Sequence, residues 1–177
     1  MKKFKIYVAG PDVFKPYYQN IIAENKNILT KYCLQGKIEL VFPAENDDEL
    51  DKKLNEETDK YKKGILIRNA NKQLIQQCDA VIANLENFRG LEPDVGTCFE
   101  IGYAQGLGKD VVVFSMHSNY KLTTLYNGTF DYQSNTTVED FNMPFNLMLA
   151  PDNISEISNC FENAFTLLAK KHGFLLI

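Results

Sequence analysis

The feature that most constrains the fold is a regular alternation of short apolar runs with longer segments of helical spacing. The third run is apolar throughout after its first residue, as expected for a strand buried on both faces of a parallel sheet. The order strand, helix, strand, helix predicts an α/β fold, with an open, mainly parallel sheet and helices on both faces. The four predicted strands are residues 4–9, 38–42, 79–85 and 110–114.

The segments between these runs carry the 3.6-residue spacing of helices. An acidic, lysine-rich stretch at 45–63 is either a solvated helix or a loop, and residues 115–145 break the pattern. A loop that long is uncommon in a compact domain, so we expect it to have a functional or interface role within one domain of 177 residues. The predicted helices are residues 14–32, 65–77, 97–107 and 154–172.

Composition narrows the function classes. Lys plus Arg is 19 and Asp plus Glu is 23, and this mild acidity argues against a nucleic acid or a membrane surface as the partner. No apolar run approaches the roughly 20 residues of a membrane helix. The first 12 residues suit a strand better than a signal peptide, so we expect a cytoplasmic protein with four reduced cysteines.

Cofactor motifs are absent from the sequence. The two histidines lie outside any metal-binding spacing, and neither G-x-G-x-x-G nor G-x-x-x-x-G-K-[ST] occurs. We therefore expect no metal and no other cofactor, and acid–base chemistry that uses carboxylates.

The predicted crevice lies at the carboxyl ends of the strands, where open α/β sheets bind ligands. Asp94 and Glu100 flank a turn at Gly96, and Asp79 at the head of the third strand adds a third carboxylate. Crowded carboxylates split their pKa values, so that one stays ionised as a nucleophile while another holds a proton. That division of roles is the one used to break glycosidic bonds.

Simpler interpretations compete with this one. Thr97-x-x-Glu100 matches a capping box, and on that pattern alone capping is favoured over catalysis. Asp94 is also typical of a turn after Pro93, and Asp79 of a strand start. For Arg89, the main basic residue of the crevice, a structural ion pair is favoured over contact with substrate.

The expected crevice is acidic and partly aromatic. Its acids would disfavour a phosphorylated substrate and favour a neutral, hydroxyl-rich ligand. Some of the neighbouring aromatic rings could stack a flat base, although Phe42 is more typical of core. The acids are Asp12, Glu45, Glu92, Asp94 and Glu100, and the aromatics are Tyr7, Phe14, Phe42 and Phe88.

Four blocks of the sequence together resemble the nucleoside 2-deoxyribosyltransferase family. They are Y-V-A-G-P-D-V-F at 7–14, C-D-A-V-I-A-N-L at 78–85, F-R-G-x-E-P-D-V-G-T-x-F-E-I-G-Y-A at 88–104 and F-N-L-M-L at 145–149. The resemblance implies a flavodoxin-like fold and transfer of 2-deoxyribose between the bases of free 2′-deoxynucleosides.

The resemblance also implies catalytic roles. Glu100 is similar to the family nucleophile, which holds the sugar as a covalent ester. Tyr7 resembles the tyrosine that orients this carboxylate, and Asp79 resembles the acid–base group beside the base.

Substrate-binding roles follow from the same blocks. Asp94 resembles the carboxylate that holds a sugar hydroxyl. Asn146 resembles a residue lent by a neighbouring subunit to the sugar 5′-hydroxyl, with Met148 close by, which implies a homo-oligomer, either a dimer or an assembly of dimers. Further candidates in the first block are Gly10, Asp12 and Phe14.

Two alternatives stay open. The same superfamily contains hydrolases of 2-deoxynucleoside 5′-monophosphates, which usually have serine where this chain has Asp94, and Asp94 thus favours free nucleosides. A non-catalytic nucleoside-binding module is the third possibility, although it would not need Tyr7, Asp79, Asp94 and Glu100 together.

Overall fold

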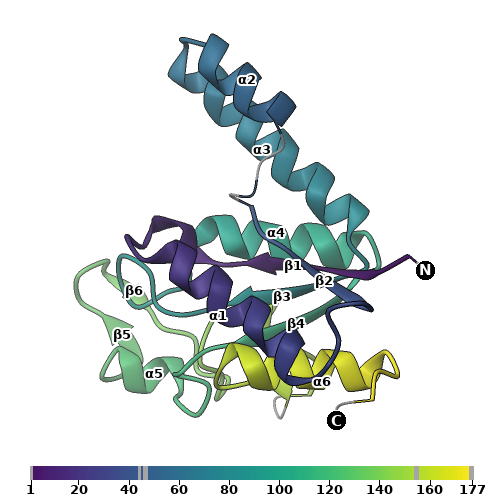
Figure 1. Cartoon of the computed structure of the whole chain (residues 1–177). Coiled ribbons are helices and arrows are strands. Elements are labelled where there is room, and N and C mark those ends of the chain that lie inside the picture. Colours follow the sequence, from purple (N-terminus) through teal and green to yellow (C-terminus); the bar gives the residue numbers. More distant parts are fainter. Residues whose placement is uncertain (1, 44, 46–47, 154–155, 176–177) are drawn as a thin grey trace.

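The central feature of the fold is a parallel sheet (Figure 1). The computed structural model describes residues 2–43, 45, 48–153 and 156–175. In these residues the four main strands lie side by side in the order β2-β1-β3-β4, all parallel, as in flavodoxin-like folds. The predicted α/β sheet is confirmed. The strands are β1 (Phe4–Ala9), β2 (Ile38–Val41), β3 (Ala80–Asn84) and β4 (Asp110–Phe114).

Helices cover both faces of the sheet. α1 (Tyr18–Lys31) and α6 (Phe161–Lys171) pack on one face, and α3 (Lys60–Gln77) and α4 (Val95–Gly106) on the other. Their existence was predicted, but two of the helices begin later than expected. α1 begins at Tyr18 rather than at residue 14, and α6 begins at Phe161, whereas the predicted start at residue 154 lies outside the described residues.

Local chemistry explains both late starts. Before α1 the chain forms a short 3-10 helix, η1 (Pro11–Phe14), and Pro16 disfavours helical geometry at the residue before it. Before α6, Ser158 bridges to Phe114 at the end of β4, which holds that segment extended.

The core is divided by the sheet into two clusters, because successive side chains of a strand point to opposite faces. Ile6 and Val8 of β1 join the cluster under α1 and α6, whereas Tyr7 and Ala9 join the cluster under α4. Tyr7 is thereby fully buried on the α4 side, although its hydroxyl is polar.

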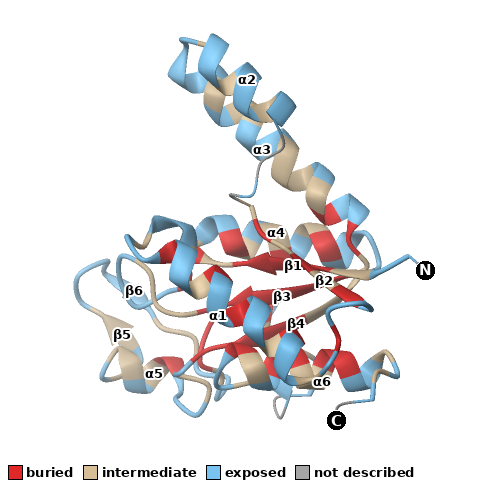
Figure 2. Ribbon diagram, in the orientation of Figure 1, coloured by how far each residue is buried: buried red, intermediate tan, exposed pale blue. Residues whose placement is uncertain are grey.

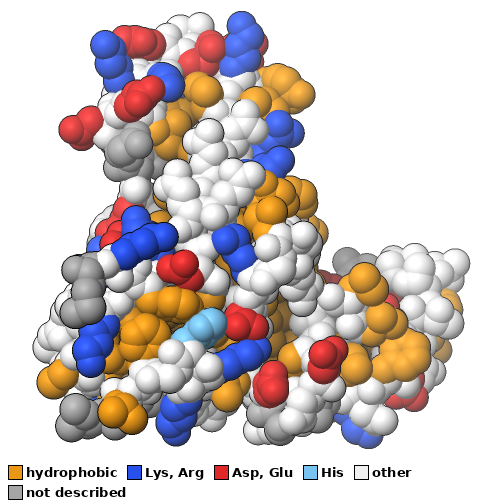
Figure 3. All heavy atoms as spheres, turned by 90° about the vertical axis from the view of Figure 1, so that its right-hand side faces the viewer, with side chains coloured by type: hydrophobic (Ala, Val, Ile, Leu, Met, Phe, Trp, Pro, Cys, Tyr) orange, Lys and Arg blue, Asp and Glu red, His pale blue; other side chains and the backbone are white. Residues whose placement is uncertain are grey.

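A helical hairpin of α2 (Asp48–Glu56) and α3 projects from the body of the molecule (Figures 1 and 2). α2 has no buried residue and α3 buries only Ile75, near the sheet. The stretch predicted as either a solvated helix or a loop is therefore a solvated helix over 48–56. Figure 3 shows side chains of both charges on the hairpin, with hydrophobic ones between them.

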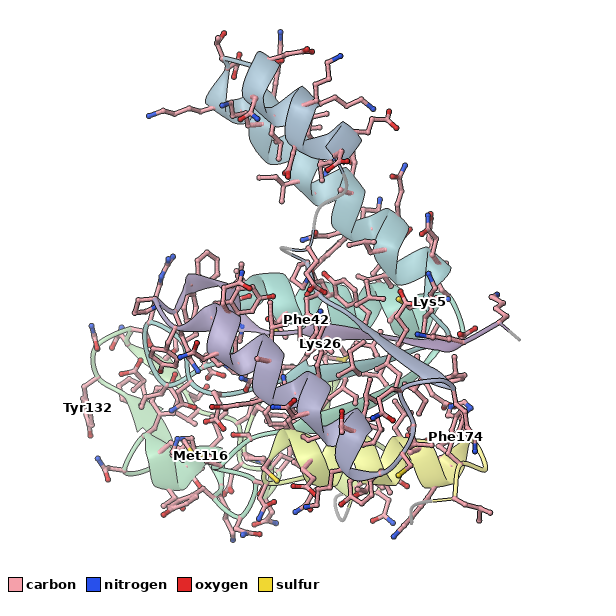
Figure 4. All side chains as sticks on the ribbon, viewed as in Figure 1. Lys5, Lys26, Phe42, Met116, Tyr132 and Phe174 are labelled. Atoms are coloured by element: carbon pink, nitrogen blue, oxygen red, sulfur yellow. The ribbon has the colours of Figure 1, made fainter. Side chains whose placement is uncertain are left out.

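The segment 115–145, predicted as a long loop, contains short elements. α5 (Leu122–Leu125) is followed by an antiparallel pair, β5 (Phe130–Asp131) and β6 (Thr136–Thr137), and a 3-10 helix η2 (Leu147–Leu149) comes next. Tyr132 in this segment is 89% exposed and points away from the body (Figure 4). Nowhere in the described chain is a helix both long and apolar enough to cross a membrane.

Truncating Phe165 tests the cluster under α1 and α6. Phe165 is fully buried, so Phe165→Ala is expected to lower the free energy of unfolding by about 3–5 kcal/mol. Phe141→Ala is the matched control, because Phe141 is 58% exposed and its loss should cost no more than about 0.5 kcal/mol. Urea unfolding followed by circular dichroism measures both, and equal losses would contradict this account of the core.

Candidate active site

The centre of the site is a hydrogen bond between a strand and a helix. Tyr7 lies in the middle of β1, and Glu100 lies in the second turn of α4, which packs over it. The Tyr7 hydroxyl donates a hydrogen bond of 2.7 Å to Oε1 of Glu100. The structure thus brings together the two residues that the sequence predicted as nucleophile and orienting group.

The environment of this pair changes its protonation. Burial raises the pKa of Glu100 to about 7, while the hydrogen bond from Tyr7 acts in the opposite direction and the charge of Asp94 adds to the rise. Burial, together with the neighbouring Glu100 carboxylate, also raises the pKa of Tyr7 well above its usual value. Tyr7 therefore remains a hydrogen-bond donor at neutral pH, where Glu100 is divided between its acid and its ionised form.

Glu100 opens into a cavity of about 370 Å³ at the carboxyl ends of β1 and β2. This volume is within the usual range for small-molecule sites. Among the described residues, no group of three His, Cys, Asp or Glu is placed to hold a metal ion. The cavity is lined by Gly10, Val13 and Phe14 of the first loop, Pro43 after β2, Ile67 and Asn71 of α3, and Asp94, Gly96, Thr97 and Glu100.

Asp94 begins α4 as its N-cap. Its Oδ2 accepts hydrogen bonds from the backbone N–H of Thr97 at 2.8 Å and from the Thr97 hydroxyl at 2.9 Å. The interpretation of Thr97 and Glu100 as a capping box is therefore wrong, because Asp94 caps the helix and Glu100 bonds to Tyr7. Within the described residues, Oδ1 of Asp94 accepts no hydrogen bond and remains available at the cavity wall.

Gly10 allows the first loop to approach β3 closely. A Cβ at this position would lie 2.7 Å from the Cβ of Asn84, and its φ of 158° with ψ of 166° belongs to a region essentially restricted to glycine. Asn84, which is buried, donates a hydrogen bond of 2.9 Å to Oδ2 of Asp12, whose Oδ1 pairs with Lys15 at 2.6 Å. Asp12 thus holds the loop in place and is not among the residues that line the cavity.

Asp79 lies at the amino ends of the strands, on the side of the sheet away from the cavity. It precedes the first residue of β3, and its Oδ2 accepts a hydrogen bond of 2.7 Å from the backbone N–H of Lys5. The cavity lies at the carboxyl ends of the strands, so Asp79 does not line it and the structure does not bring this carboxylate to Glu100. The expected grouping of three carboxylates is corrected to a pair, Asp94 and Glu100.

Two residues of α3 were missed by the sequence reasoning. Ile67 and Asn71, one helical turn apart, line the cavity across from α4. Their spacing is the only signal that links them, and the polar residues around Asn71 give it no distinction in the sequence. Asn71 supplies an amide that can both donate and accept hydrogen bonds.

The other predicted acids are engaged elsewhere. Glu45 pairs with Lys26, and Glu92 accepts a hydrogen bond of 3.1 Å from the Tyr126 hydroxyl. The cavity wall is therefore less acidic than the sequence suggested.

Asn146 and Met148 lie outside the cavity of their own chain. Asn146 caps η2, where its Oδ1 accepts from the backbone N–H of Met148 at 3.0 Å and its amide donates to Glu139. It lines a separate hollow with Glu92 and Tyr126, and Met148 is 75% exposed.

The rim aromatics have different environments. Phe42 is buried core, as favoured, with the Lys26 ammonium over its ring (Figure 4). Phe14 and Phe88 stack with ring centroids 5.2 Å apart. The ion pair expected for Arg89 is not found with any described carboxylate; its guanidinium lies over the rings of Phe88 and Phe14, at 4.6 and 5.3 Å.

The raised pKa of Glu100 predicts a pH-dependent cost in stability. Below its ordinary pKa of 4.5 the group is protonated in both folded and unfolded chains, and the cost develops as the pH rises to about 7. Each pKa unit is worth about 1.4 kcal/mol, so the full cost is on the order of 3 kcal/mol. Glu100→Gln should therefore raise the melting temperature by about 5 °C or more at pH 8.5. Little change is expected near pH 4.5, and an equal shift at both pH values, measured by calorimetry, would contradict the burial argument.

Comparison with known proteins places the chain in a family. The sequence model of the family described as nucleoside 2-deoxyribosyltransferase matches residues 6–148. A solved 2-desoxiribosyltransferase from Leishmania mexicana is 34% identical, with a TM-score of 0.74, and the match covers 97% of this chain and 99% of that one.

Two more distant solved structures also match. A 2-deoxyribosyltransferase from Bacillus psychrosaccharolyticus is 17% identical, with a TM-score of 0.45 and coverage of 88% and 97%. A CMP N-glycosidase from Clostridium botulinum is 19% identical, with a TM-score of 0.34 and coverage of 62% and 70%. No curated protein sequence matches. The family model matches most of the chain, and the Leishmania mexicana structure is 34% identical over nearly all of it. This chain therefore belongs to the nucleoside 2-deoxyribosyltransferase family.

Proposed function

We propose that this protein transfers 2-deoxyribose between the nucleobases of free 2′-deoxynucleosides through a covalent deoxyribosyl ester on Glu100. The observation that carries the proposal is the partly buried hydrogen bond from Tyr7 to Glu100 at the wall of a cavity. Tyr7 engages Oε1, which leaves Oε2 as the atom that attacks C1′ of the sugar. The bond from C1′ to the base nitrogen breaks as the bond from C1′ to Oε2 forms.

The second half of the reaction reverses the first. An arriving base attacks C1′ through a ring nitrogen, which forms the new glycosidic bond and loses its proton to water, and Glu100 leaves again as a carboxylate. Two displacements at one carbon retain its configuration. The pKa of about 7 leaves part of Glu100 ionised at neutral pH and able to attack, and the hydrogen bond from Tyr7 stabilises the carboxylate as it leaves.

The departing base needs stabilisation from other groups. The base takes the electron pair of the broken bond together with a proton. The position of Asp79 at the far edge of the sheet does not favour it as proton donor. Among the described residues that line the cavity, Asn71 has the side-chain amide that can hydrogen-bond the base. An amide holds no acidic proton, so the base takes its proton from water.

Sugar recognition is assigned to Asp94 and to a neighbouring copy of the chain. Oδ1 of Asp94 accepts a hydrogen bond from a sugar hydroxyl, and its charge disfavours a substrate phosphate. Asn146 and Met148 lie outside their own cavity, which supports a homo-oligomer, a dimer or an assembly of dimers, in which they complete a neighbour's site.

Removing the nucleophile tests the reaction. Glu100→Ala is expected to lower base exchange, measured as deoxyadenosine formed from deoxyinosine and adenine, by at least about 10³-fold. A 2-fluoro-2-deoxy sugar substrate should add its mass to Glu100 in the wild type. Glu162→Ala is the control, since Glu162 lies on α6 beyond the opposite face of the sheet. Retained exchange in Glu100→Ala would refute the assignment, and release of deoxyribose at equal rates with and without adenine would identify a hydrolase instead.

Removing the Tyr7 hydroxyl tests its effect on the nucleophile. The hydrogen bond from Tyr7 lowers the pKa of Glu100, so Tyr7→Phe should raise that pKa above its value of about 7. The acidic limb of the kcat/KM profile is then expected to move to higher pH, with a larger loss at pH 6 than at pH 9. An unmoved limb would assign Tyr7 a role other than stabilising the carboxylate.

A further inference from the structure

The loop that carries Arg89 has an unusual backbone. Arg89 has a φ of 55°, and Gly90 follows with a φ of 157°. The turn is closed by a hydrogen bond of 2.9 Å from the backbone N–H of Phe88 to the carbonyl of Glu92. Left-handed geometry is unfavourable for residues other than glycine, asparagine and aspartate. In the described chain, the other non-glycine residues with positive φ are Cys33, Asn127, Asn135 and Asn142.

An arginine at such a position needs a compensating interaction of its side chain. Asparagine or glycine would adopt this φ at lower cost, and Arg89 has no ion pair with the described residues that would explain its presence. Its guanidinium instead lies over two rings, 4.6 Å from the centroid of Phe88 and 5.3 Å from that of Phe14. Cation–π attraction of this kind favours arginine.

The stack joins two separate loops at the cavity. Phe14 ends η1, whereas Phe88 and Arg89 belong to the loop between β3 and α4. The contact from Asn84 to Asp12 fixes the backbone of the first loop but does not hold the ring of Phe14, which is 60% exposed and lines the cavity of Glu100. Phe88 and Arg89 are the aromatic and cationic partners of this ring.

We infer that Arg89 is a positioning residue that acts through Phe14, holding its ring as a fixed wall against which a planar nucleobase binds. The identity of the ligand rests on the proposed function. That the Phe14 ring is held in one position rests only on its contacts with Phe88 and Arg89. A fixed wall favours bound substrate and transition state alike, so it lowers KM and leaves kcat unchanged.

A double-mutant cycle tests this inference on the full chain. Its members are Arg89→Asn, which keeps a residue tolerant of positive φ, Phe14→Leu, and the double variant. Deoxyinosine affinity is measured by calorimetry in a Glu100→Gln background that cannot turn over, and KM and kcat are measured without that change. Arg89→Asn should weaken binding and raise KM about 3- to 10-fold with kcat unchanged, and Arg89→Lys should restore part of the loss.

The cycle separates positioning from direct contact. If Arg89 acts through Phe14, the double variant binds no more weakly than Phe14→Leu alone. Additive losses would show that Arg89 touches the nucleoside itself and would overturn the inference, as would unchanged affinity in Arg89→Asn. Lys31→Gln is the control, because it removes a cation over the Tyr32 ring at the far end of α1.

A ligand-free measurement distinguishes this inference from the proposed reaction. In Arg89→Asn, the NMR chemical shift of a selectively labelled Phe14 ring should move toward that of a free phenylalanine, and the ring should become more mobile. The melting temperature should stay the same or rise. An unchanged ring signal would overturn the inference whatever the substrate is. A wild type that fails to exchange bases, with the ring response intact, would overturn only the proposed function.

Discussion

The hydrogen bond from Tyr7 to Glu100 is the interaction on which the rest of the site depends. The pleat of β1 directs Tyr7 toward α4, and Asp94 begins α4 so that Glu100 falls in its second turn, above Tyr7. A carboxylate in this position is costly, because burial disfavours its ionised form. The bond from Tyr7 recovers part of that cost and engages Oε1 of the carboxylate. In the proposed reaction, the same desolvation that reduces stability makes the ionised group a better nucleophile once it forms.

Specific contacts hold the loops that surround the cavity. Gly10 places the first loop against Asn84, and the buried amide of Asn84 ties Asp12 to the end of β3. On the other side of the cavity, Asp94 serves both as a helix cap and as a cavity wall. Side-chain hydrogen bonds and the close backbone approach at Gly10 thus hold the positions of the cavity walls, and the sheet supplies the rigid base from which the loops extend.

Local patterns were sufficient to predict the strands, and the family resemblance implied the pair Tyr7 and Glu100, but neither predicted the whole cavity. The sequence groups Asp79 with Glu100 because both adjoin the third strand, yet strand direction puts Asp79 at the amino end of that strand, away from the cavity. The sequence does not reveal Ile67 and Asn71 as cavity residues, because α3 has only a weak amphipathic pattern. Tertiary packing decides which of its side chains face the cavity. Thr97 and Glu100 match a capping box, in which the Glu100 carboxylate would accept a hydrogen bond from the backbone N–H of Thr97. In the structure, Asp94 accepts that hydrogen bond instead. Where two local motifs compete, the sequence alone does not reveal the outcome.

In the proposed reaction, the balance between transfer and hydrolysis depends on what covers the ester. In the proposed mechanism the departing base leaves a space beside C1′ that either a new base or water can fill. Phe14, Pro43 and Ile67 give that space apolar walls, which favour a planar ring over water. In the proposed oligomer, the exposed Met148 beside Asn146 is an apolar group suited to closing the mouth of the cavity on a neighbouring copy. Oligomerisation would then act on the fate of the intermediate as well as on substrate affinity, because excluding water prevents hydrolysis of a reactive ester.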